Sequence, residues 1–217
     1  MRSVSIKNLS AKLFIVLISL NLACGGGAPP EENDTEVAQE TSAPSDTKPA
    51  QSYYYINSIN NESLAEITIE GQSIMIKTPT GDLFSKLKGD KRKYYDQSDA
   101  LKYAVKLKGT ESFKLRDGNE QLIWKVKVTA DKIKVANNEE MTDAFEIKQN
   151  ESGKIKLKRN DEELKAMRFD PNSAATKVGD RYNVRNFNGS LAMGVLLIDE
   201  LGETEKYIIC TELLNMQ

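Results

Sequence analysis

The stretch SFKLRDGNEQLIWKVKV, residues 112–128, decides the fold class because it has the pattern of a β-hairpin. Its apolar residues fall at alternate positions on either side of a turn: Phe113, Leu115, Trp124, Val126 and Val128. Alternate side chains of a strand point to opposite faces, so one face is apolar and the other carries lysine. Asp117-Gly118 supplies the turn chemistry. The stretch predicts two antiparallel strands that turn one face to a core.

The same alternation occurs in segments on both sides of this hairpin. Further strands are expected within ITIEGQSIMIKT (67–78), LKYAVKLKG (101–109), KIKV (132–135), AFEIK (144–148), GKIKLKRNDEELKAMRF (153–169) and RYNVRNF (181–187), and SYYYIN (52–57) is expected to be the first strand. FKLRDGNEQL (113–122) aligns without gaps on IKLKRNDEEL (155–164). Two related hairpins indicate a repeated unit in an antiparallel meander.

The carboxyl-terminal region SLAMGVLLIDELGETEKYIICTELL, residues 190–214, has a different character. It begins with LAMGVLLI, which is apolar on every side and therefore typical of a buried helix. Tyr207, Cys210 and Leu214 recur at helical spacing. We expect two short helices, with YIIC (207–210) as a strand in the alternative.

Together these patterns predict one mainly β domain over residues 52–217. An antiparallel meander would close into a barrel, or pack as a sandwich, since either arrangement hides the strand edges. A buried hydrophobic carboxyl-terminal helix completes the expected fold.

The amino terminus has the proportions of a secretory signal. Arg2, Lys7 and Lys12 precede the apolar run LFIVLISL, residues 13–20. A membrane-spanning helix needs about 20 apolar residues, so this run is too short for an ordinary span. The alternatives are an ordinary signal peptide cut elsewhere and an uncleaved anchor.

The residues after this run, Asn21, Leu22, Ala23 and Cys24, resemble the lipobox of bacterial lipoproteins. Ala23 and Cys24 fit that motif, whereas Asn21 stands where the family usually has leucine. The resemblance implies a signal peptide over residues 1–23, removal before Cys24, and fatty acyl chains, palmitate among them, on that cysteine. By resemblance to enterobacterial lipoprotein sorting, Gly25 after the cysteine implies the outer membrane of the cell envelope.

Residues 24–51 are expected to form a disordered acidic tether. This segment is rich in Gly, Pro, Ser and Thr and carries six acidic residues against one lysine. It holds too few large apolar side chains to offset its ordering entropy. A flexible chain of this length has an average span of about 30 Å.

Composition excludes several kinds of chemistry. The chain has no histidine, which rules out histidine-dependent nucleophile systems and histidine metal sites. Its 30 Lys and Arg balance 32 Asp and Glu, so there is no overall basic signal for nucleic acid. No residues indicate a metal site, a cofactor or a catalytic group, and Cys210 among apolar neighbours is typical of an unreactive core thiol.

Two basic segments contain the candidate ligand-binding residues. GDKRKYYD (89–96) brings cations next to aromatic rings, and the hairpin places lysines on one strand face. The candidates are Lys91, Arg92, Lys93, Tyr94, Lys125 and Lys127. Such a face would attract anionic lipid or polysaccharide. The alternative is an ordinary solvated face that discourages edge pairing.

The order of elements also resembles tubby, LURP-one-related and scramblase-like proteins. The resemblance lies in YAVKLKG, FKLRDGNEQLIWKV, KIKV, IKLKRNDEELKAMRF and SLAMGVLLI, over roughly residues 100–205. It implies a β-barrel around a central hydrophobic helix and, for some members, binding of phosphoinositide headgroups. No individual binding residue is implied.

The sequence therefore favours a non-enzymatic binding or structural module, anchored to membrane lipid through acylated Cys24. Its expected partners are an envelope protein or an anionic lipid. The first alternative is a tubby-like domain that binds lipid headgroups, and the second is a hydrolase that uses paired carboxylates.

Overall fold

The computed structural model describes residues 50–216, which form fourteen strands and two helices. The strands are β1 (Gln51–Ser58), β2 (Ser63–Glu70), β3 (Ser73–Lys77), β4 (Leu83–Lys88), β5 (Lys91–Tyr95), β6 (Leu101–Lys108), β7 (Ser112–Asp117), β8 (Leu122–Val128), β9 (Lys132–Ala136), β10 (Phe145–Gln149), β11 (Lys154–Arg159), β12 (Glu162–Arg168), β13 (Thr176–Val178) and β14 (Tyr182–Arg185). The helices are the 3₁₀ helix η1 (Leu191–Leu197) and the α-helix α1 (Glu203–Asn215).

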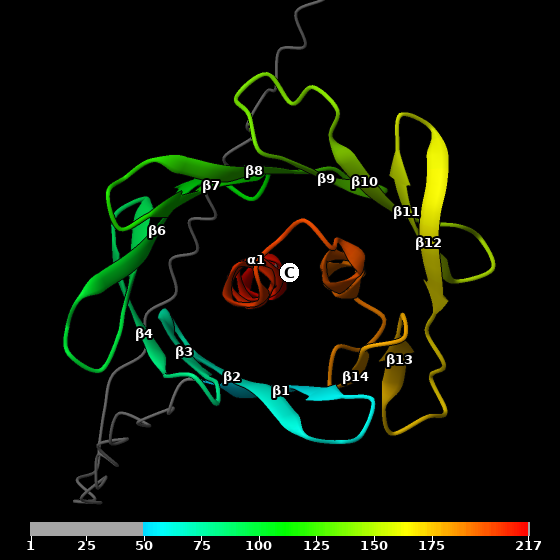
Figure 1. The fold of residues 1–217 in the computed structure, drawn as a ribbon, viewed down its shortest axis with the longest axis horizontal. Helices are drawn as coiled ribbons and strands as arrows, with labels where there is room; N and C mark the ends of the chain where they lie inside the picture. The colour runs from blue at the N-terminus through cyan, green and yellow to red at the C-terminus, as the bar shows by residue number, and fades with distance from the viewer. Residues whose placement is uncertain (1–49, 217) are drawn as a thin grey trace, which may run out of the picture. The chain divides into compact units, whose positions relative to one another are not determined.

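All fourteen strands belong to one antiparallel sheet that curls into a nearly closed barrel (Figure 1). Strands β1 to β12 form a meander in which each pairs with the next. The chain then makes the hairpin β13–β14, and β14 pairs with the free edge of β1, at the end of the meander that is far from β12 in the strand order. A single curled sheet confirms the predicted barrel and excludes the sandwich.

The predicted hairpins are present, and their alternation places the core inside the barrel. In β7 and β8, Leu115 is opposite Trp124 and Phe113 is opposite Val126, and all four side chains are buried. The lysines between them face outward. Strands β4, β5 and β13 were not expected from the sequence, because LFSKLK and KRKYY mix cations into their patterns and TKV is only three residues long.

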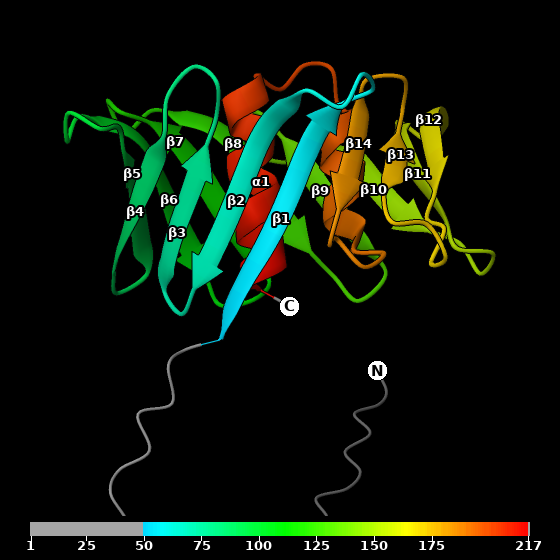
Figure 2. The same ribbon diagram turned by 90° about the horizontal axis from the view of Figure 1, so that it is seen from below.

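The barrel encloses both helices (Figure 1). Seen from the side in Figure 2, α1 runs between the two ends of the barrel behind the wall of strands. Buried side chains of η1 and α1 join those of the strands in one core. The two expected helices are confirmed, and the alternative of a strand at residues 207–210 is wrong because these residues lie in the middle of α1.

The two related hairpins differ at their turns. Phe113 and Leu115 in one, and Ile155 and Leu157 in the other, are equivalently buried. The next aligned pair diverges, since Leu164 is 44% exposed. A two-residue turn joins β11 to β12, whereas four residues join β7 to β8. Residues that are aligned in sequence after the turn therefore do not occupy equivalent positions in the second strand.

Strands β12 and β13 are the two edges of the sheet, and they lie side by side where the barrel closes. A hollow of about 540 Å³ marks this seam, lined by Lys165, Ala166, Met167, Lys177, Gly179, Asp180 and Arg181. The chain crosses from one edge to the other through residues 169–175.

The predicted signal peptide, Cys24 and most of the predicted tether lie outside the described residues. Within residues 50–216, neither helix has both the length and the apolar character needed to cross a membrane.

Candidate functional site

The interior of the barrel is occupied by protein. Helix α1 buries Ile208, Ile209 and Cys210 completely, and η1 buries Ala192 and Val195 completely. A barrel of this kind differs from those whose interior holds a small ligand. The polar groups inside it and the surface outside it are the places where a function could lie.

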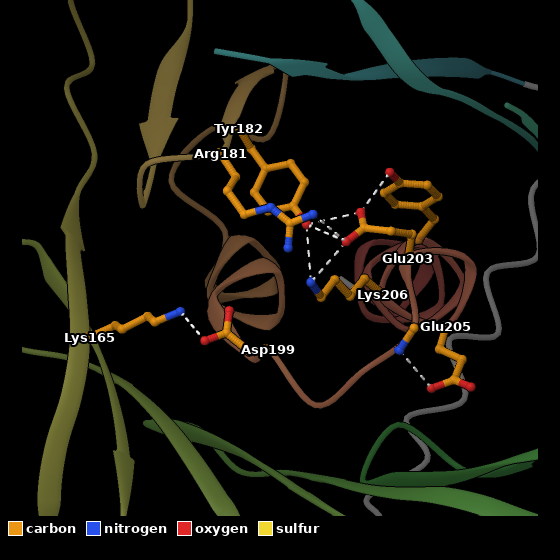
Figure 3. A network of polar contacts seen from close by, with 9 residues as sticks. Lys165, Arg181, Tyr182, Asp199, Glu203, Glu205 and Lys206 are labelled. Atoms are coloured by element: carbon orange, nitrogen blue, oxygen red, sulfur yellow. Dashed lines mark hydrogen bonds and ion pairs between the residues drawn. The ribbon is translucent and has the colours of Figure 1, made fainter. Parts of the chain in front are cut away.

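One polar network lies at the amino-terminal end of α1 (Figure 3). The Glu203 carboxylate accepts hydrogen bonds from the hydroxyls of Tyr182, at 2.9 Å, and Tyr207, at 3.0 Å. The buried ammonium of Lys206 donates to Tyr182 at 3.0 Å and to Glu203 at 3.2 Å. Arg181 closes the network with an ion pair to Glu203 at 3.1 Å.

The electrostatics of this network favour a charged Glu203. Burial alone would raise the pKa of Glu203, but hydrogen bonds from Tyr182, Lys206 and Tyr207 and the Lys206 charge outweigh burial and lower it. Burial raises the pKa of both tyrosines, and the Glu203 charge raises them further. The polar groups satisfy one another, so the network fastens α1 to β14.

A second buried cluster lies near the other end of α1. Nε of Arg92 is 3.0 Å from Oε1 of Glu212, and the Tyr94 hydroxyl donates to the same oxygen at 2.6 Å. Arg92 also donates to the carbonyl of Gln72. Burial raises the pKa of Glu212 although Arg92 opposes the shift. Among the described residues, Oε2 of Glu212 has no hydrogen-bond partner.

The six candidate binding residues divide between the two sides of the barrel wall. Arg92 and Tyr94 point into the core and contact Glu212. Lys91 and Lys93 point outward from the same strand, together with Tyr95, and line a hollow of about 410 Å³ with Lys86 and Lys88. Lys125 and Lys127 are also on the outer face, in β8.

The strand register adds lysines to this outer group that the sequence pattern did not single out. Lys88 is opposite Lys91, Lys91 is opposite Lys106, Lys106 is opposite Lys114, and Lys114 is opposite Lys125. These five residues form an unbroken row across β4, β5, β6, β7 and β8, which we call the lysine ladder. The row depends on the register of four strand pairs, and that register shows only in the folded structure.

The lysine ladder is incompletely neutralised. Glu139 pairs with Lys114 at 2.7 Å and with Lys125 at 3.3 Å, and Glu120 pairs with Lys91. Lys88 and Lys106 have no acidic partner among the described residues. Like charges directly opposite one another destabilise a sheet. The ladder therefore has an electrostatic cost that two carboxylates only partly offset.

A shorter row of lysines crosses another part of the wall, where Lys132 of β9 is opposite Lys148 of β10 and Lys148 is opposite Lys156 of β11. Glu163 of β12 pairs with Lys154 at 2.9 Å and with Lys156 at 2.7 Å. Hydrogen bonds from these two lysines lower the pKa of Glu163 to about 2. Glu163 and Glu146, which pairs with Lys148 at 3.2 Å, therefore give two of the three lysines in this row an acidic partner.

Two buried charged residues were missed at the sequence level. Lys206 and Glu212 are both buried in α1, where most of the other buried residues are apolar. Their position in a helix that the sequence predicts to be buried could have revealed them, because a buried charge requires a polar partner from a neighbouring strand.

Within residues 50–216, no group of three or more Cys, Asp or Glu side chains is placed to hold a metal ion. Cys210 donates a hydrogen bond to the Ala192 carbonyl at 3.2 Å, and burial raises its pKa, as expected for a core thiol. No protein-family description, no curated protein and no solved structure matches this chain.

Proposed function

We propose that this protein is a lipid-anchored, non-enzymatic binding module of the bacterial cell envelope, and that the outer wall of its barrel binds an anionic partner. The observation that carries the proposal is the lysine ladder. Five cations in register on five adjacent strands cost stability, and an anionic partner would offset that cost.

The filled interior supports the same assignment. Because η1 and α1 occupy the barrel, the outer wall is the surface left for a partner. The five lysines of the ladder lie on that wall and supply contact and attraction for an anionic partner. Basic residues near an anionic surface contribute about 1 kcal/mol each.

The anchor rests on the sequence around Cys24. Acyl chains on this cysteine would hold the barrel at a bilayer, and the acidic tether would give it an average reach of about 30 Å. Tethering raises the effective concentration of any partner on the same surface, so modest affinity would suffice. Metabolic labelling with palmitate tests this part: we expect label on the wild type and none on Cys24→Ser, and equal labelling of both would refute it.

A charge-matched pair of variants tests the binding surface. Lys88→Gln/Lys106→Gln removes the two ladder lysines without acidic partners among the described residues, and Lys154→Gln/Lys156→Gln removes two cations that each pair with Glu163. We expect full-length protein in nonionic detergent to bind dextran sulfate and not neutral dextran, with a salt-sensitive affinity. The ladder variant should bind about thirtyfold more weakly, from about 1 kcal/mol per lysine, and the control variant almost normally. An equal loss of affinity in both variants would show that the lysine ladder is not the binding surface.

A tubby-like role in binding lipid headgroups is the second candidate. It is supported by the placement of the carboxyl-terminal helices inside the ring of strands, as the sequence resemblance implied. Phosphatidylglycerol doped into the same detergent micelles should then compete with dextran sulfate for the wild type. Competition equal to that of phosphatidylcholine would reject this candidate and leave the first in place.

A further inference from the structure

The lysine ladder follows a curved path, and this shape narrows the choice of partner. It crosses five of the fourteen strands, from β4 on one side of the ring to β8 on another (Figure 1). Adjacent strands are about 4.8 Å apart, so the ladder is about 19 Å long. A flat bilayer touches a curved wall over only a few strands. A flexible linear polymer can follow the curve and meet all five lysines.

Aromatic and apolar side chains lie on the same outer face of β4 and β5, four residues, or about 13 Å, along these strands from the ladder pair Lys88 and Lys91. Tyr95 is opposite Phe84, and Phe84 is opposite Met75, all on the outer face. Phe84 is 38% exposed, and the ammonium of Lys86 lies 4.9 Å from the centre of the Tyr95 ring. Sugar rings have apolar C–H faces that pack against aromatic side chains, while lysines bind their acidic substituents.

We propose that the lysine ladder binds a linear acidic polysaccharide, whose carboxylate or phosphate groups lie against Lys88, Lys91, Lys106, Lys114 and Lys125 and whose sugar rings contact Phe84 and Tyr95. This inference rests on the proposed function and names its partner class. The hollow lined by Lys86, Lys88, Lys91, Lys93 and Tyr95 is where the two kinds of contact meet.

Chain length and sugar content are the two properties that the experiment varies. Fluorescently labelled polygalacturonate and its short oligomers are titrated with full-length protein in nonionic detergent, and anisotropy reports binding. We expect affinity to rise with oligomer length until the chain spans about 32 Å, the length of the ladder plus the stretch of β4 and β5 that reaches Phe84 and Tyr95, and to increase little per added residue afterwards. Inorganic polyphosphate serves as a linear polyanion without sugar, and oligothymidylate as a nucleic-acid strand.

Two variants separate charge from ring contact. Lys88→Gln/Lys106→Gln should weaken binding of both polygalacturonate and polyphosphate at least tenfold, while Lys154→Gln/Lys156→Gln should leave both nearly unchanged. Phe84→Ala removes a partly exposed ring from the outer face, so the fold should persist. It should weaken polygalacturonate binding several-fold and leave polyphosphate binding unchanged.

The outcomes that would overturn the inference are distinct from those that would overturn the proposed function. Binding of phosphatidylglycerol micelles or polyphosphate without polygalacturonate would reject the polysaccharide and keep an anionic partner. Tighter binding of oligothymidylate than of polygalacturonate, or equal loss of both polymers in Phe84→Ala, would also reject it. Failure to bind any of these polyanions would reject both proposals.

Discussion

Gly194 lies in η1 at the point where this helix meets the inner face of β10. A Cβ atom at this position would be 2.3 Å from Cγ2 of Ile147 and 3.3 Å from Cγ2 of Ile155. Both neighbours are buried and cannot move away. The glycine that interrupts the apolar run LAMGVLLI therefore has a packing role, because it lets the helix backbone approach the wall.

We expect Gly194→Ala to lower the free energy of unfolding by about 1–3 kcal/mol, the usual cost of overpacking a core. Equilibrium urea denaturation measures the change. Gly202→Ala is the control, since a Cβ there would first meet the flexible side chain of Glu205 at 3.4 Å. A loss in Gly194→Ala no larger than in Gly202→Ala would contradict the close approach.

The buried pair of Arg92 and Glu212 predicts strong coupling. Removing one member of a buried ion pair leaves an uncompensated charge and costs about 3–5 kcal/mol, whereas removing both is often close to neutral. Arg92→Met and Glu212→Gln should each be severely destabilising. The double variant should be much more stable than the sum of the two losses implies, because the amide introduced at position 212 can still accept from Tyr94 while no buried charge remains. Additive losses in a double-mutant cycle of urea denaturation would argue against the pair.

At the scale of the element, the network around Glu203 predicts how the attachment of α1 depends on pH. The pKa of Glu203 is lowered in the folded protein, so its contribution to stability is complete above the unfolded value of about 4.3. That contribution is lost as pH falls through the lower folded value. Glu203→Gln lacks the charge and the titration.

We therefore expect Glu203→Gln to be less stable than the wild type by about 1–3 kcal/mol at pH 7, the cost of weakening hydrogen bonds to a charged group. The difference should shrink as pH falls below about 4. Urea denaturation at pH 7, 5 and 3 measures it, and Glu151→Gln in the exposed β10–β11 turn sets the baseline. A difference that stays constant with pH would exclude this role for the carboxylate.

The hairpin β7–β8 shows what a local pattern predicts and what it misses. The alternation gave both strands and their buried faces. The turn differs in detail: the Asp117 side chain accepts from the backbone N–H groups of Asn119 and Gln121 at 2.9 and 2.8 Å, and Glu120 takes the positive φ of 66°. A Cβ at Gly118 would be 2.6 Å from the Leu101 carbonyl oxygen. That glycine serves a contact with β6, which a local pattern cannot reveal.

At the scale of the whole molecule, the sequence predicted the meander, the barrel and the buried helices. It did not predict that LKYAVKLKG and SFKLRDGN would bring Lys106 opposite Lys114, because the register is a property of the paired strands. Nor did it predict that Arg92 and Tyr94 point into the core while Lys91 and Lys93 point outward. Alternation implies that neighbours face opposite ways, but β5 was not identified as a complete strand.

The helices inside the barrel predict that the strands alone do not fold. Residues of α1 occupy the centre of the core, from Tyr207 to Leu214. A chain that ends at Leu201 would leave the inner faces of the wall in contact with water. We expect it to lose the cooperative thermal transition in circular dichroism, and a synthetic peptide of residues 203–216 added in trans should restore part of it. A cooperative transition without the peptide would show that the wall is stable by itself.

The electrostatic cost of the lysine ladder gives a prediction that does not depend on any partner. Lys106 is opposite Lys91 on one side and Lys114 on the other, and it has no acidic partner among the described residues. We expect Lys106→Gln to raise the free energy of unfolding by about 0.2–1 kcal/mol at low ionic strength, the usual size of a cross-strand pair term. Because salt screens exposed charges, the gain should fade in 0.5 M sodium chloride, where the Debye length is below about 8 Å. Lys156 is also opposite a lysine, Lys148, but its ion pair with Glu163 offsets that repulsion, so Lys156→Gln should show no gain. If Lys106→Gln proves neutral or destabilising in low salt, the ladder is not strained, and stability is not given up there for binding.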